Sequence, residues 1–492
     1  RSCLVGSEMC IRDRYSIRPG DRVAILMKNS PEFPLIFMAL SSIGAVAVCL
    51  NSWWTSDELK YGFMDSKVKL VFTDEQRLAK IKGFVSEMGV QTVLCRHQNS
   101  DKSDEFWNSL LTSKNNELPR TTIDQDSDFA VMYTSGSTGH PKGVVMTHRG
   151  AISTLMSWHF GLRVLDVMGL GPVPYVDKNN QPYQPCQLVS VPFFHVSGTH
   201  GGLLLALWSG TKLVIMKKWD PPEAVRLIEL EKVSRFGGVP TMAAEILGEA
   251  KKVGAKLESI RLIDTGGAAR PADQAREMAE SIPNVLTGTS YGMTETNALG
   301  IAIRGKEYLE NPEVTGRLIA PLAEMRIVDE FDNDVEIGNV GELVLKSAAN
   351  MRCYLNKDAE TSEVLKDGWL YTGDLAKIDK NELITLVDRK KNIIIRGGEN
   401  ISAQEVQTVI LEHPDVIEAA IFALPNERLG EIVGACVFCG ETSNADEDSL
   451  KEFLRKSLAA YKIPEHIWFK KKPLPRVASE KIDVEALKKE YS

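Results

Sequence analysis

The residues with the clearest chemical potential lie in a short segment rich in glycine and hydroxyl side chains, Tyr133–Gly143. It contains three glycines, two serines, two threonines and one lysine, Lys142. Glycine lets the backbone approach phosphate oxygens, successive amides can form an anion-binding nest, and lysine adds a point charge. The segment is not a Walker A loop, because no Gly-Lys-Ser/Thr ending follows at the required spacing. Strand-like apolar runs flank it, so we expect a phosphate-binding loop rather than a flexible linker.

Three other segments offer groups that suit a nucleotide. Tyr291–Thr296 places a carboxylate beside a hydroxyl, a combination that suits Mg²⁺ held together with phosphate oxygens. Asp374 ends the segment Gly368–Asp374, and one carboxylate can accept hydrogen bonds from both ribose hydroxyls. Gly266–Ala268 follows an apolar strand-like run, where paired glycines permit close approach of a flat ligand. Taken singly, each segment is equally typical of a helix start or a turn.

In this order, the motifs resemble those of acyl-CoA synthetases of the adenylate-forming superfamily, which also contains firefly luciferase and peptide-synthetase adenylation domains. The resemblance extends from about residue 16 to the end of the chain. It implies that a carboxylic acid, a medium- or long-chain fatty acid in our interpretation, is activated by ATP as an acyl-adenylate and passed to the thiol of coenzyme A. The implied cofactors are ATP, Mg²⁺ and CoA.

The resemblance also implies roles for individual residues. Glu295 and Thr138 would hold the metal, Thr294 would contact the α-phosphate, and Asp374 would bind ribose. The remaining nucleotide contacts would come from the phosphate loop, from the glycine turn that lines the adenine and acyl sites, and from the segment that packs against adenine: Thr134, Ser135, Gly136, Ser137, Gly139, Lys142, Gly266, Gly267, Ala268, Tyr291, Gly292 and Met293.

The charged run Asp388–Lys391 matches the inter-domain hinge of this family. By resemblance, Arg389 contacts ribose or phosphate and Lys391 occupies the pivot. The loop that follows would face the thiol tunnel in the second half-reaction through Gly397, Gly398 and Glu399. For Glu405 we favour a structural role, as the partner of Ser402 in a capping box at a helix start.

A lysine near the C-terminus bridges the carboxylate and the α-phosphate in this family, and Lys481 is the matching residue. Val477 stands where threonine is usual, and Glu480 where glycine is usual. If that glycine has positive φ, Glu480 needs a different backbone conformation, and its charge lies beside the ammonium group. The expected catalytic set is therefore Lys481, Thr294, Glu295, Lys142 and Arg389.

His195 takes the position at which relatives that activate amino acids place an aspartate. Without a carboxylate there, an α-amino acid would lack its anchor. A single histidine is more often structural than catalytic, so we assign His195 no catalytic role. An apolar run at residues 201–208, together with Trp158, is consistent with an apolar acyl pocket, but core packing explains these residues equally well.

Alternating strand-like and helix-like runs must position these residues. The alternation predicts an α/β fold: a large N-terminal domain of mixed and parallel sheets flanked by helices, then a small, mobile α+β C-terminal domain. We place the boundary at the charged run, with residues 15–390 as the AMP-binding domain, its start truncated, and residues 391–492 as the mobile domain. Residues 1–14 show no clear periodicity, and we leave them out of the fold as a non-native segment.

Composition limits the classes of partner. The net charge is −8, and no basic stripe with interleaved aromatic residues is present, which argues against nucleic-acid binding. No apolar run is long enough for a transmembrane helix, although peripheral membrane contact is compatible with the sequence. The eight cysteines form no disulfide framework, and we expect reduced thiols and a cytoplasmic protein. Monomer and homodimer stay open, as do a carrier-protein acceptor and a catalytically inactive binding homologue.

Overall fold

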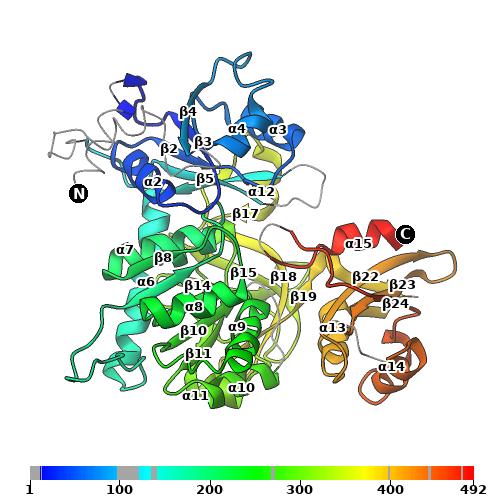
Figure 1. Ribbon diagram of the computed structural model, residues 1–492. Coiled ribbons are helices and arrows are strands. Elements are labelled where there is room, and N and C mark those ends of the chain that lie inside the picture. Colours follow the sequence, from blue (N-terminus) through cyan, green and yellow to red (C-terminus); the bar gives the residue numbers. More distant parts are fainter. Residues whose placement is uncertain are drawn as a thin grey trace.

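A seven-stranded sheet forms the first layer of the N-terminal part in the computed structural model (Figure 1). The structure describes residues 11–12, 14–96, 121–134, 141–266, 272–396, 399–440, 445–477 and 480–491. Strands β1 to β5 pair in parallel, whereas β6 and β16 add antiparallel. The order across the sheet is β16 (Cys353–Tyr354), β6 (Lys142–Thr147), β5 (Asp128–Thr134), β2 (Val46–Cys49), β1 (Arg22–Leu26), β3 (Leu70–Asp74) and β4 (Gln91–Arg96).

A second seven-stranded sheet repeats this design. Its strands β7 to β11 are parallel, and β12 and β13 close it in the antiparallel sense. The order is β13 (Arg317–Leu318), β12 (Ile301–Arg304), β11 (Leu286–Tyr291), β10 (Leu262–Gly266), β9 (Arg235–Gly238), β7 (Cys186–Val189) and β8 (Lys212–Ile215). The carboxyl ends of parallel strands share one sheet edge, which is where α/β proteins usually bind ligands.

The two remaining sheets are smaller. An antiparallel sheet contains β14 (Ala323–Val328), β15 (Gly341–Ser347), β17 (Leu365–Lys366), β18 (Trp369–Ile378) and β19 (Ile384–Arg389). The C-terminal sheet contains β20 (Ile393–Arg396), β21 (Glu399–Ser402), β22 (Glu418–Asn426), β23 (Gly430–Phe438) and β24 (His466–Lys470). The predicted large α/β domain with a smaller α+β domain after it is confirmed.

The helices cover the sheets and begin where local sequence favours it. Thr55 forms a capping box with Glu58 at the start of α3, and Asp220 caps α8 ahead of two prolines. The N-terminal helices are α2 (Glu32–Ser42), α3 (Ser56–Ser66), α4 (Glu75–Ile81), α6 (His148–Val167), the π-helix η1 (Ser197–Leu204), α7 (Leu205–Ser209), α8 (Pro221–Glu231), α9 (Pro240–Val253), α10 (Ala272–Ser281), α11 (Gly305–Glu310) and α12 (Asp358–Val364). The C-terminal helices are α13 (Ala403–Leu411), α14 (Glu447–Leu454) and α15 (Val484–Tyr491), and short 3₁₀ turns lie at η2 (Thr294–Thr296), η3 (Lys390–Asn392) and η4 (Ala460–Lys462).

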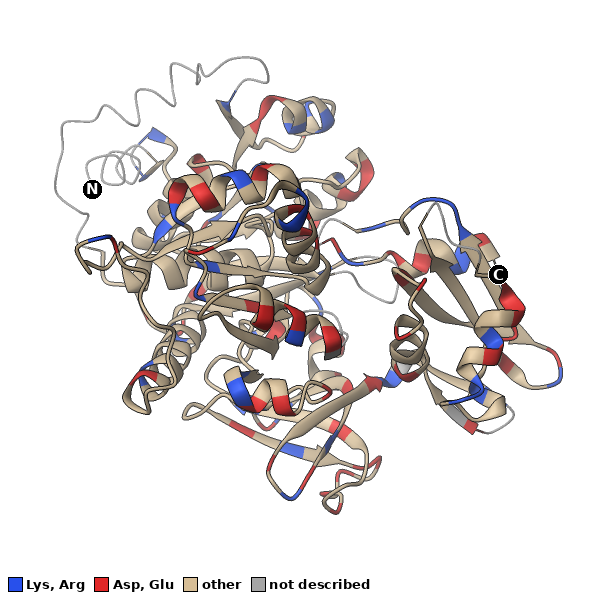
Figure 2. Cartoon of the chain, turned by 60° about the horizontal axis from the view of Figure 1, so that its bottom comes forward, with Lys and Arg blue, Asp and Glu red and all other residues tan. Residues whose placement is uncertain are grey.

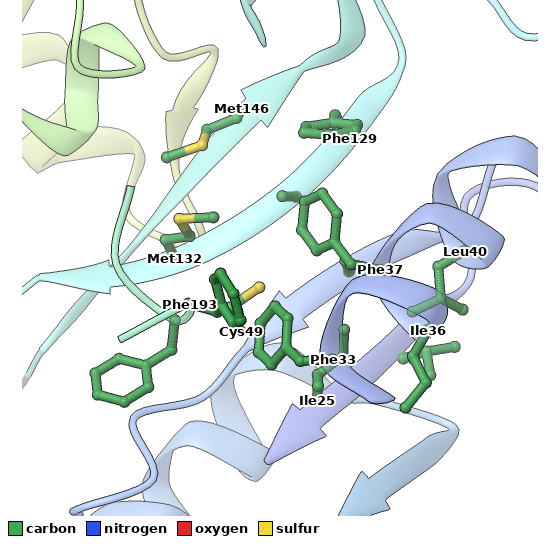
Figure 3. Packing of buried hydrophobic residues seen from close by; sticks show 14 of the residues in the cluster. Ile25, Phe33, Ile36, Phe37, Leu40, Cys49, Phe129, Met132, Met146 and Phe193 are labelled. Atoms are coloured by element: carbon green, nitrogen blue, oxygen red, sulfur yellow. The ribbon is translucent and has the colours of Figure 1, made fainter. Parts of the chain in front are cut away.

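The largest core lies between the first sheet and α2 and extends to the start of the second sheet (Figure 3). The rings of Phe33 and Phe193 pack in a tilted arrangement with centroids 5.3 Å apart, and Phe37 meets Phe129 edge-on. Ile11 is fully buried in the same core. Ile11 thus adds its apolar surface to the core, although it belongs to the segment 1–14 that the sequence analysis left out of the fold.

Two local predictions meet different outcomes in the C-terminal part. Ser402 caps α13 by accepting the Glu405 amide, as predicted. Glu405 does not complete the capping box, since its carboxylate pairs with Lys462 at 2.7 Å. Cys436 is buried in β23, and no group of three metal-ligating side chains occurs in the described part of the chain.

Charged residues are distributed over both parts of the chain (Figure 2). Acidic and basic residues are interspersed rather than gathered by sign, which is typical of a mixed, solvated surface. No helix that the structure describes is long and apolar enough to cross a bilayer.

Candidate active site

The ends of the phosphate loop are positioned by a pair of neighbouring antiparallel strands. Thr134 ends β5 and Lys142 begins β6, and the two residues face each other across the ladder. The Thr134 hydroxyl donates to the Lys142 carbonyl at 3.4 Å. The loop residues between them, Ser135, Gly136, Ser137, Thr138 and Gly139, lie outside the described residues. The strand pair therefore fixes where the loop starts and ends.

Lys142 belongs to a chain of contacts that ends at Glu295. Its ammonium group lies 4.9 Å from the ring centroid of Tyr354, a cation–π arrangement. The Tyr354 hydroxyl donates to Oε1 of Glu295 at 2.9 Å. Burial raises the pKa of Glu295, and this tyrosine hydrogen bond opposes the shift in part. A buried carboxylate with a raised pKa gains from a nearby cation, which suits the predicted metal role of Glu295.

Asp374 connects two segments that the sequence analysis considered separately, those of Tyr291 and Arg389. One carboxylate oxygen accepts from the Tyr291 hydroxyl at 2.6 Å, and the other pairs with Nε of Arg389 at 2.9 Å. Asp374 and Arg389 are cross-strand partners in β18 and β19. Burial and the Asp374 charge raise the pKa of Tyr291, so the hydroxyl stays protonated as a donor. The structure thus brings together the predicted adenine, ribose and hinge contacts.

Two glycines are required by close backbone contacts around Tyr291. A Cβ on Gly266, the last residue of β10, would lie 2.6 Å from the Ser290 carbonyl oxygen. A Cβ on Gly292 would lie 2.3 Å from the Ala298 carbonyl oxygen. Both positions therefore exclude larger residues. Gly267 and Ala268, predicted in the same turn as Gly266, lie outside the described residues.

The segment after Tyr291 holds the rest of this motif in a tight turn. Met293 precedes η2, and its sulfur lies 3.9 Å from the Tyr291 hydroxyl. Thr294 begins η2, directly before Glu295. The turn therefore places Thr294 between the adenine-side tyrosine and the buried carboxylate.

Lys481 reaches this site from the C-terminal part of the chain. Burial, and then the positive charge of Lys481, lower the pKa of His195, and Lys481 itself interacts with Arg389 and Asp374. Lys481 as a whole residue is exposed to solvent. Burial of its ammonium group by surrounding protein lowers its pKa most, and the charge of Arg389 lowers it further. Lys481 therefore lies close enough to Arg389, Asp374 and His195 to interact electrostatically with each of them.

A short turn presents Lys481. The Val477 amide donates to the Lys481 carbonyl at 2.8 Å, and the Glu480 amide donates to the Val477 carbonyl at 2.9 Å. Glu480 has φ +64°, so it retains the conformation that favours glycine instead of a different one. A non-glycine residue in this region costs about 1–2 kcal/mol.

His195 and His200 are both buried, and burial lowers the pKa of each to about 4. His200 Nε2 lies 2.9 Å from Oδ1 of Asn297. His195 Nε2 has no hydrogen-bond partner among the described residues. A buried ring nitrogen without a protein partner is available to a ligand oxygen, and the structural role of His195 stays a prediction.

The hinge region connects the two parts through Asp388. This buried carboxylate lies 2.8 Å from the Ser402 hydroxyl and accepts the Gln404 amide at 3.0 Å. Lys391 lies in η3, and its side chain is outside the described residues, as are Gly397 and Gly398. Glu399 is exposed in β21, opposite Arg396. Within the described residues, no hydrogen bond or ion pair joins Glu399 to the Asp374 cluster.

The apolar residues proposed for an acyl pocket are largely core residues. Leu203 and Leu204 are buried in the first core, and Trp158 packs against it. Trp208 is 47% exposed and meets His159 edge-on. Core packing therefore accounts for this run, and it gives little support to a particular acyl chain length.

Tyr354 is the functional residue that sequence reasoning missed. It lies in the two-residue strand β16, which pairs with β6 beside the phosphate loop. No spacing rule connects Tyr354 to Glu295, which is 59 residues away. Only the strand pairing reveals the contact.

Comparison with known proteins places the chain among nucleotide-dependent ligases. A model of the AMP-binding enzyme family matches residues 10–355, and one of the AMP-binding enzyme C-terminal domain matches residues 405–481. The chain is 29% identical to a 4-coumarate–CoA ligase of Vanilla planifolia, covering 95% of this chain and 84% of that protein. It is 30% identical to 4-coumarate–CoA ligase 2 of Nicotiana tabacum, covering 93% of this chain and 82% of that protein.

Solved structures give the same fold. The fatty acyl CoA synthetase of Mycobacterium tuberculosis matches with a TM-score of 0.74 at 27% identity, covering 99% of this chain and 91% of that one. The o-succinylbenzoate CoA synthetase of Bacillus subtilis, in complex with an acyl-adenylate, matches with a TM-score of 0.80 at 26% identity, with the same coverage. These structures share both parts of the chain described above.

Proposed function

Because the chain belongs to the AMP-binding enzyme family, we propose that it is an AMP-forming carboxylate–CoA ligase that works through the cluster around Asp374. The single observation that carries this proposal is the position of Lys481. It comes from the C-terminal part, yet it lies in the field of Arg389 and Asp374 and beside His195. A lysine there can neutralise the carboxylate and the α-phosphate that must meet.

The proposed reaction has two steps. A carboxylate oxygen of the acid attacks the α-phosphorus of ATP, the bond to the β-phosphate oxygen breaks, and pyrophosphate leaves. The thiolate sulfur of CoA then attacks the acyl carbon, and AMP leaves with the electron pair of the acyl–oxygen bond. The anionic groups repel one another, so fixed positive charge provides the main stabilisation of the first step.

The residues of this chain divide that work. Lys142 would bind the phosphate groups, Lys481 would bridge the carboxylate and the α-phosphate, and Arg389, oriented by Asp374, would face ribose or phosphate. Tyr291 would pack against adenine while its hydroxyl donates to Asp374. Lysine and arginine are the usual partners of phosphate oxygens.

A magnesium ion fits the donor groups present. Glu295 is a buried carboxylate with a raised pKa. Mg²⁺ is a hard cation that is typically bound by one carboxylate together with phosphate oxygens and waters. Thr138 is the second proposed ligand. When bound, the ion would neutralise charge on the departing phosphates.

Between the two steps, we propose that the C-terminal part reorients about Lys391, the first residue of the proposed mobile domain, and that Gly397, Gly398 and Glu399 then face the thiol. The exposed position of Glu399 supports this, because that edge of the C-terminal sheet is available for a second contact.

For the acid we propose a medium- or long-chain fatty acid, and the curated relatives favour 4-coumarate as a second candidate. Purified protein should be incubated with ATP, Mg²⁺ and either CoA or a phosphopantetheine carrier protein, across both classes of acid. Formation of an acyl-CoA with equimolar AMP would support the proposal, and the preferred acid would identify the substrate. Transfer only to the carrier protein would contradict CoA as acceptor. No AMP with any acid would overturn the proposal.

A further inference from the structure

One pocket at the junction of the two parts contains three lysines and one glutamate. Lys28, Lys217 and Lys218 line it from the N-terminal part, and Glu480 lines it from the C-terminal part. The three lysines follow β1 and β8, at the carboxyl edge of the parallel strands. Glu480 therefore enters a basic surface that belongs to the other domain.

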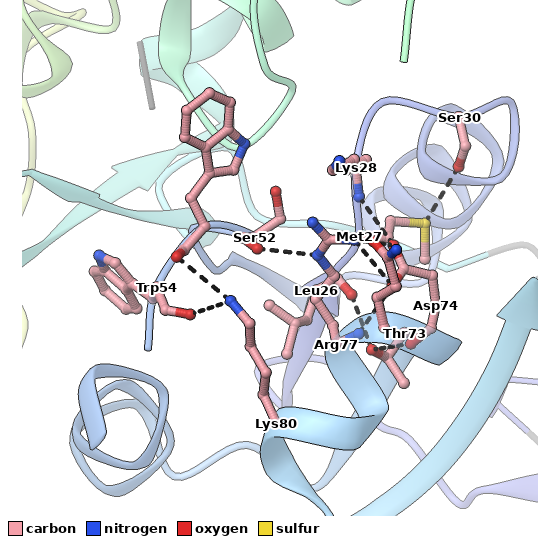
Figure 4. Close-up of polar contacts among 12 residues, drawn as sticks. Leu26, Met27, Lys28, Ser30, Ser52, Trp54, Thr73, Asp74, Arg77 and Lys80 are labelled. Carbon is pink, nitrogen blue, oxygen red and sulfur yellow. Dashed lines mark hydrogen bonds and ion pairs between the residues drawn. The ribbon is translucent and has the colours of Figure 1, made fainter. Parts of the chain in front are cut away.

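The lysines lack acidic contact partners of their own. None forms an ion pair with a carboxylate in the described part of the chain. Asp74 is the carboxylate beneath Lys28, but it already pairs with the buried Arg77 at 3.2 Å (Figure 4). Arg77 also donates to the Ser52 carbonyl at 2.9 Å, which fixes the floor of the pocket.

The charges around Lys28 confirm the excess of positive charge. Burial lowers the pKa of Lys28 most, followed by the charges of Arg77 and Lys217; Asp74 opposes them, and Lys218 lowers the pKa by a smaller amount. Glu245 is the other acid near the pocket, and it accepts a hydrogen bond from Trp219. Glu245 alone cannot balance the ammonium groups of the three lysines, so a further anion lowers the electrostatic energy of this surface.

Glu480 is held so that its side chain supplies that anion. Its carbonyl accepts from Arg476 at 2.7 Å, and Arg476 is within 3.4 Å of the Thr241 hydroxyl of the N-terminal part. Its backbone keeps φ +64° despite the Cβ. Burial raises the pKa of Glu480 most and Glu245 adds to the shift, whereas the charges of Arg476 and then of Lys218 favour the ionised carboxylate. No contact ion pair forms among the described residues, so the attraction acts across the pocket.

We infer that Glu480 is a positioning residue: its carboxylate, attracted by Lys28, Lys217 and Lys218, holds the Val477–Lys481 turn against the N-terminal domain and so keeps Lys481 at the reacting groups. This rests on the proposed function and adds to it an electrostatic contact at the residue directly before the catalytic lysine. This attraction across the pocket belongs to the arrangement in which Lys481 interacts with His195, so we expect Glu480 to act on adenylate formation and not on thioester formation.

Glu480→Gly and Glu480→Gln separate charge from backbone strain. Glycine relieves the strained φ and removes the charge, whereas glutamine keeps the strain and removes only the charge. We expect both to slow acid-dependent ATP–pyrophosphate exchange by about fivefold, the size of a partly exposed charge interaction. The reaction of preformed acyl-adenylate with CoA should stay within about twofold of the wild-type rate. Glu485→Gln, a charge loss on the exposed face of α15, is the matched control and should change neither step.

Three results would overturn the inference: a Glu480→Gly variant as fast as wild type in exchange, equal slowing of both steps, or no gain when Lys218→Glu is combined with Glu480→Lys. A measurement that does not depend on catalysis tests the positioning role even if the proposed function is wrong. Hydrogen exchange at the Val477 and Glu480 amides should speed up in Glu480→Gln but not in Glu485→Gln. If wild type shows no exchange activity with any acid, the proposed function fails, while the amide protection still decides the positioning role.

Discussion

Nε of Arg389 lies 2.9 Å from a carboxylate oxygen of Asp374, its cross-strand partner, and the Tyr291 hydroxyl holds the other oxygen at 2.6 Å. The last residue of β19, two positions before the proposed pivot Lys391, is therefore fixed by this ion pair. Since Lys481 interacts with the same pair, one buried carboxylate connects Tyr291, Arg389 and the proposed catalytic lysine.

Replacement of Lys481 by alanine should slow adenylate formation by at least about 10²-fold, the scale of a lost transition-state donor. The reaction of preformed acyl-adenylate with CoA should suffer far less, because no phosphate is then displaced. Single-turnover assays of each half-reaction measure the two rates. Equal losses in both would remove Lys481 from the proposed role, and Lys489→Ala, on exposed α15, provides the control.

Asp374→Asn should raise the KM for ATP and lower the free energy of unfolding by about 1–3 kcal/mol, the cost of a lost hydrogen bond to a charged group. The change leaves Arg389 without its charge partner and weakens the acceptor for Tyr291. Urea unfolding and ATP saturation curves test the two effects. An unchanged KM for ATP would place ribose elsewhere.

Activity should fall on the acid side of the pH profile at a higher pH than an ordinary glutamate would produce. Burial raises the pKa of Glu295, so its proton persists to higher pH and competes with Mg²⁺ for the carboxylate. Raising the Mg²⁺ concentration should move this acid limb to lower pH. Glu295→Gln should remove that Mg²⁺ dependence and lower Mg²⁺ affinity. An acid limb that does not respond to Mg²⁺ would contradict the metal assignment.

Proline at Lys391 should impair thioester formation more than pyrophosphate exchange, because it restricts the backbone at the proposed pivot. Lys391→Ala removes the same side chain and keeps the backbone free, so it should affect both steps less. The ratio of the two rates is the quantity to measure. Parallel losses in the proline variant would mean that no reorientation separates the steps.

Much of this site follows from the sequence because its motifs are local. The phosphate loop, the Tyr291–Thr296 turn and the Asp374 strand each show their residue types within a few positions. The alternation of strands and helices likewise predicted the two-part fold, since each period reflects which face of an element is buried.

Contacts between distant segments could not be predicted from the sequence. Tyr354 reaches Glu295 only because β16 pairs with β6. Glu405 was predicted to cap its own helix, but Lys462, 57 residues later, takes its carboxylate. Ile11 lies in a segment without periodicity, and only the assembled core shows that it is buried. In each case the contact depends on tertiary pairing between distant segments, which local sequence patterns do not predict.

Acid-dependent exchange of labelled pyrophosphate into ATP tests the central claim most directly, because it reports the attack of a carboxylate on the α-phosphorus without any acceptor. We predict exchange that requires both Mg²⁺ and a carboxylic acid, and that falls by at least about 10²-fold in Lys481→Ala. Folded protein that shows no exchange with any fatty acid or with 4-coumarate would contradict the account at its first step.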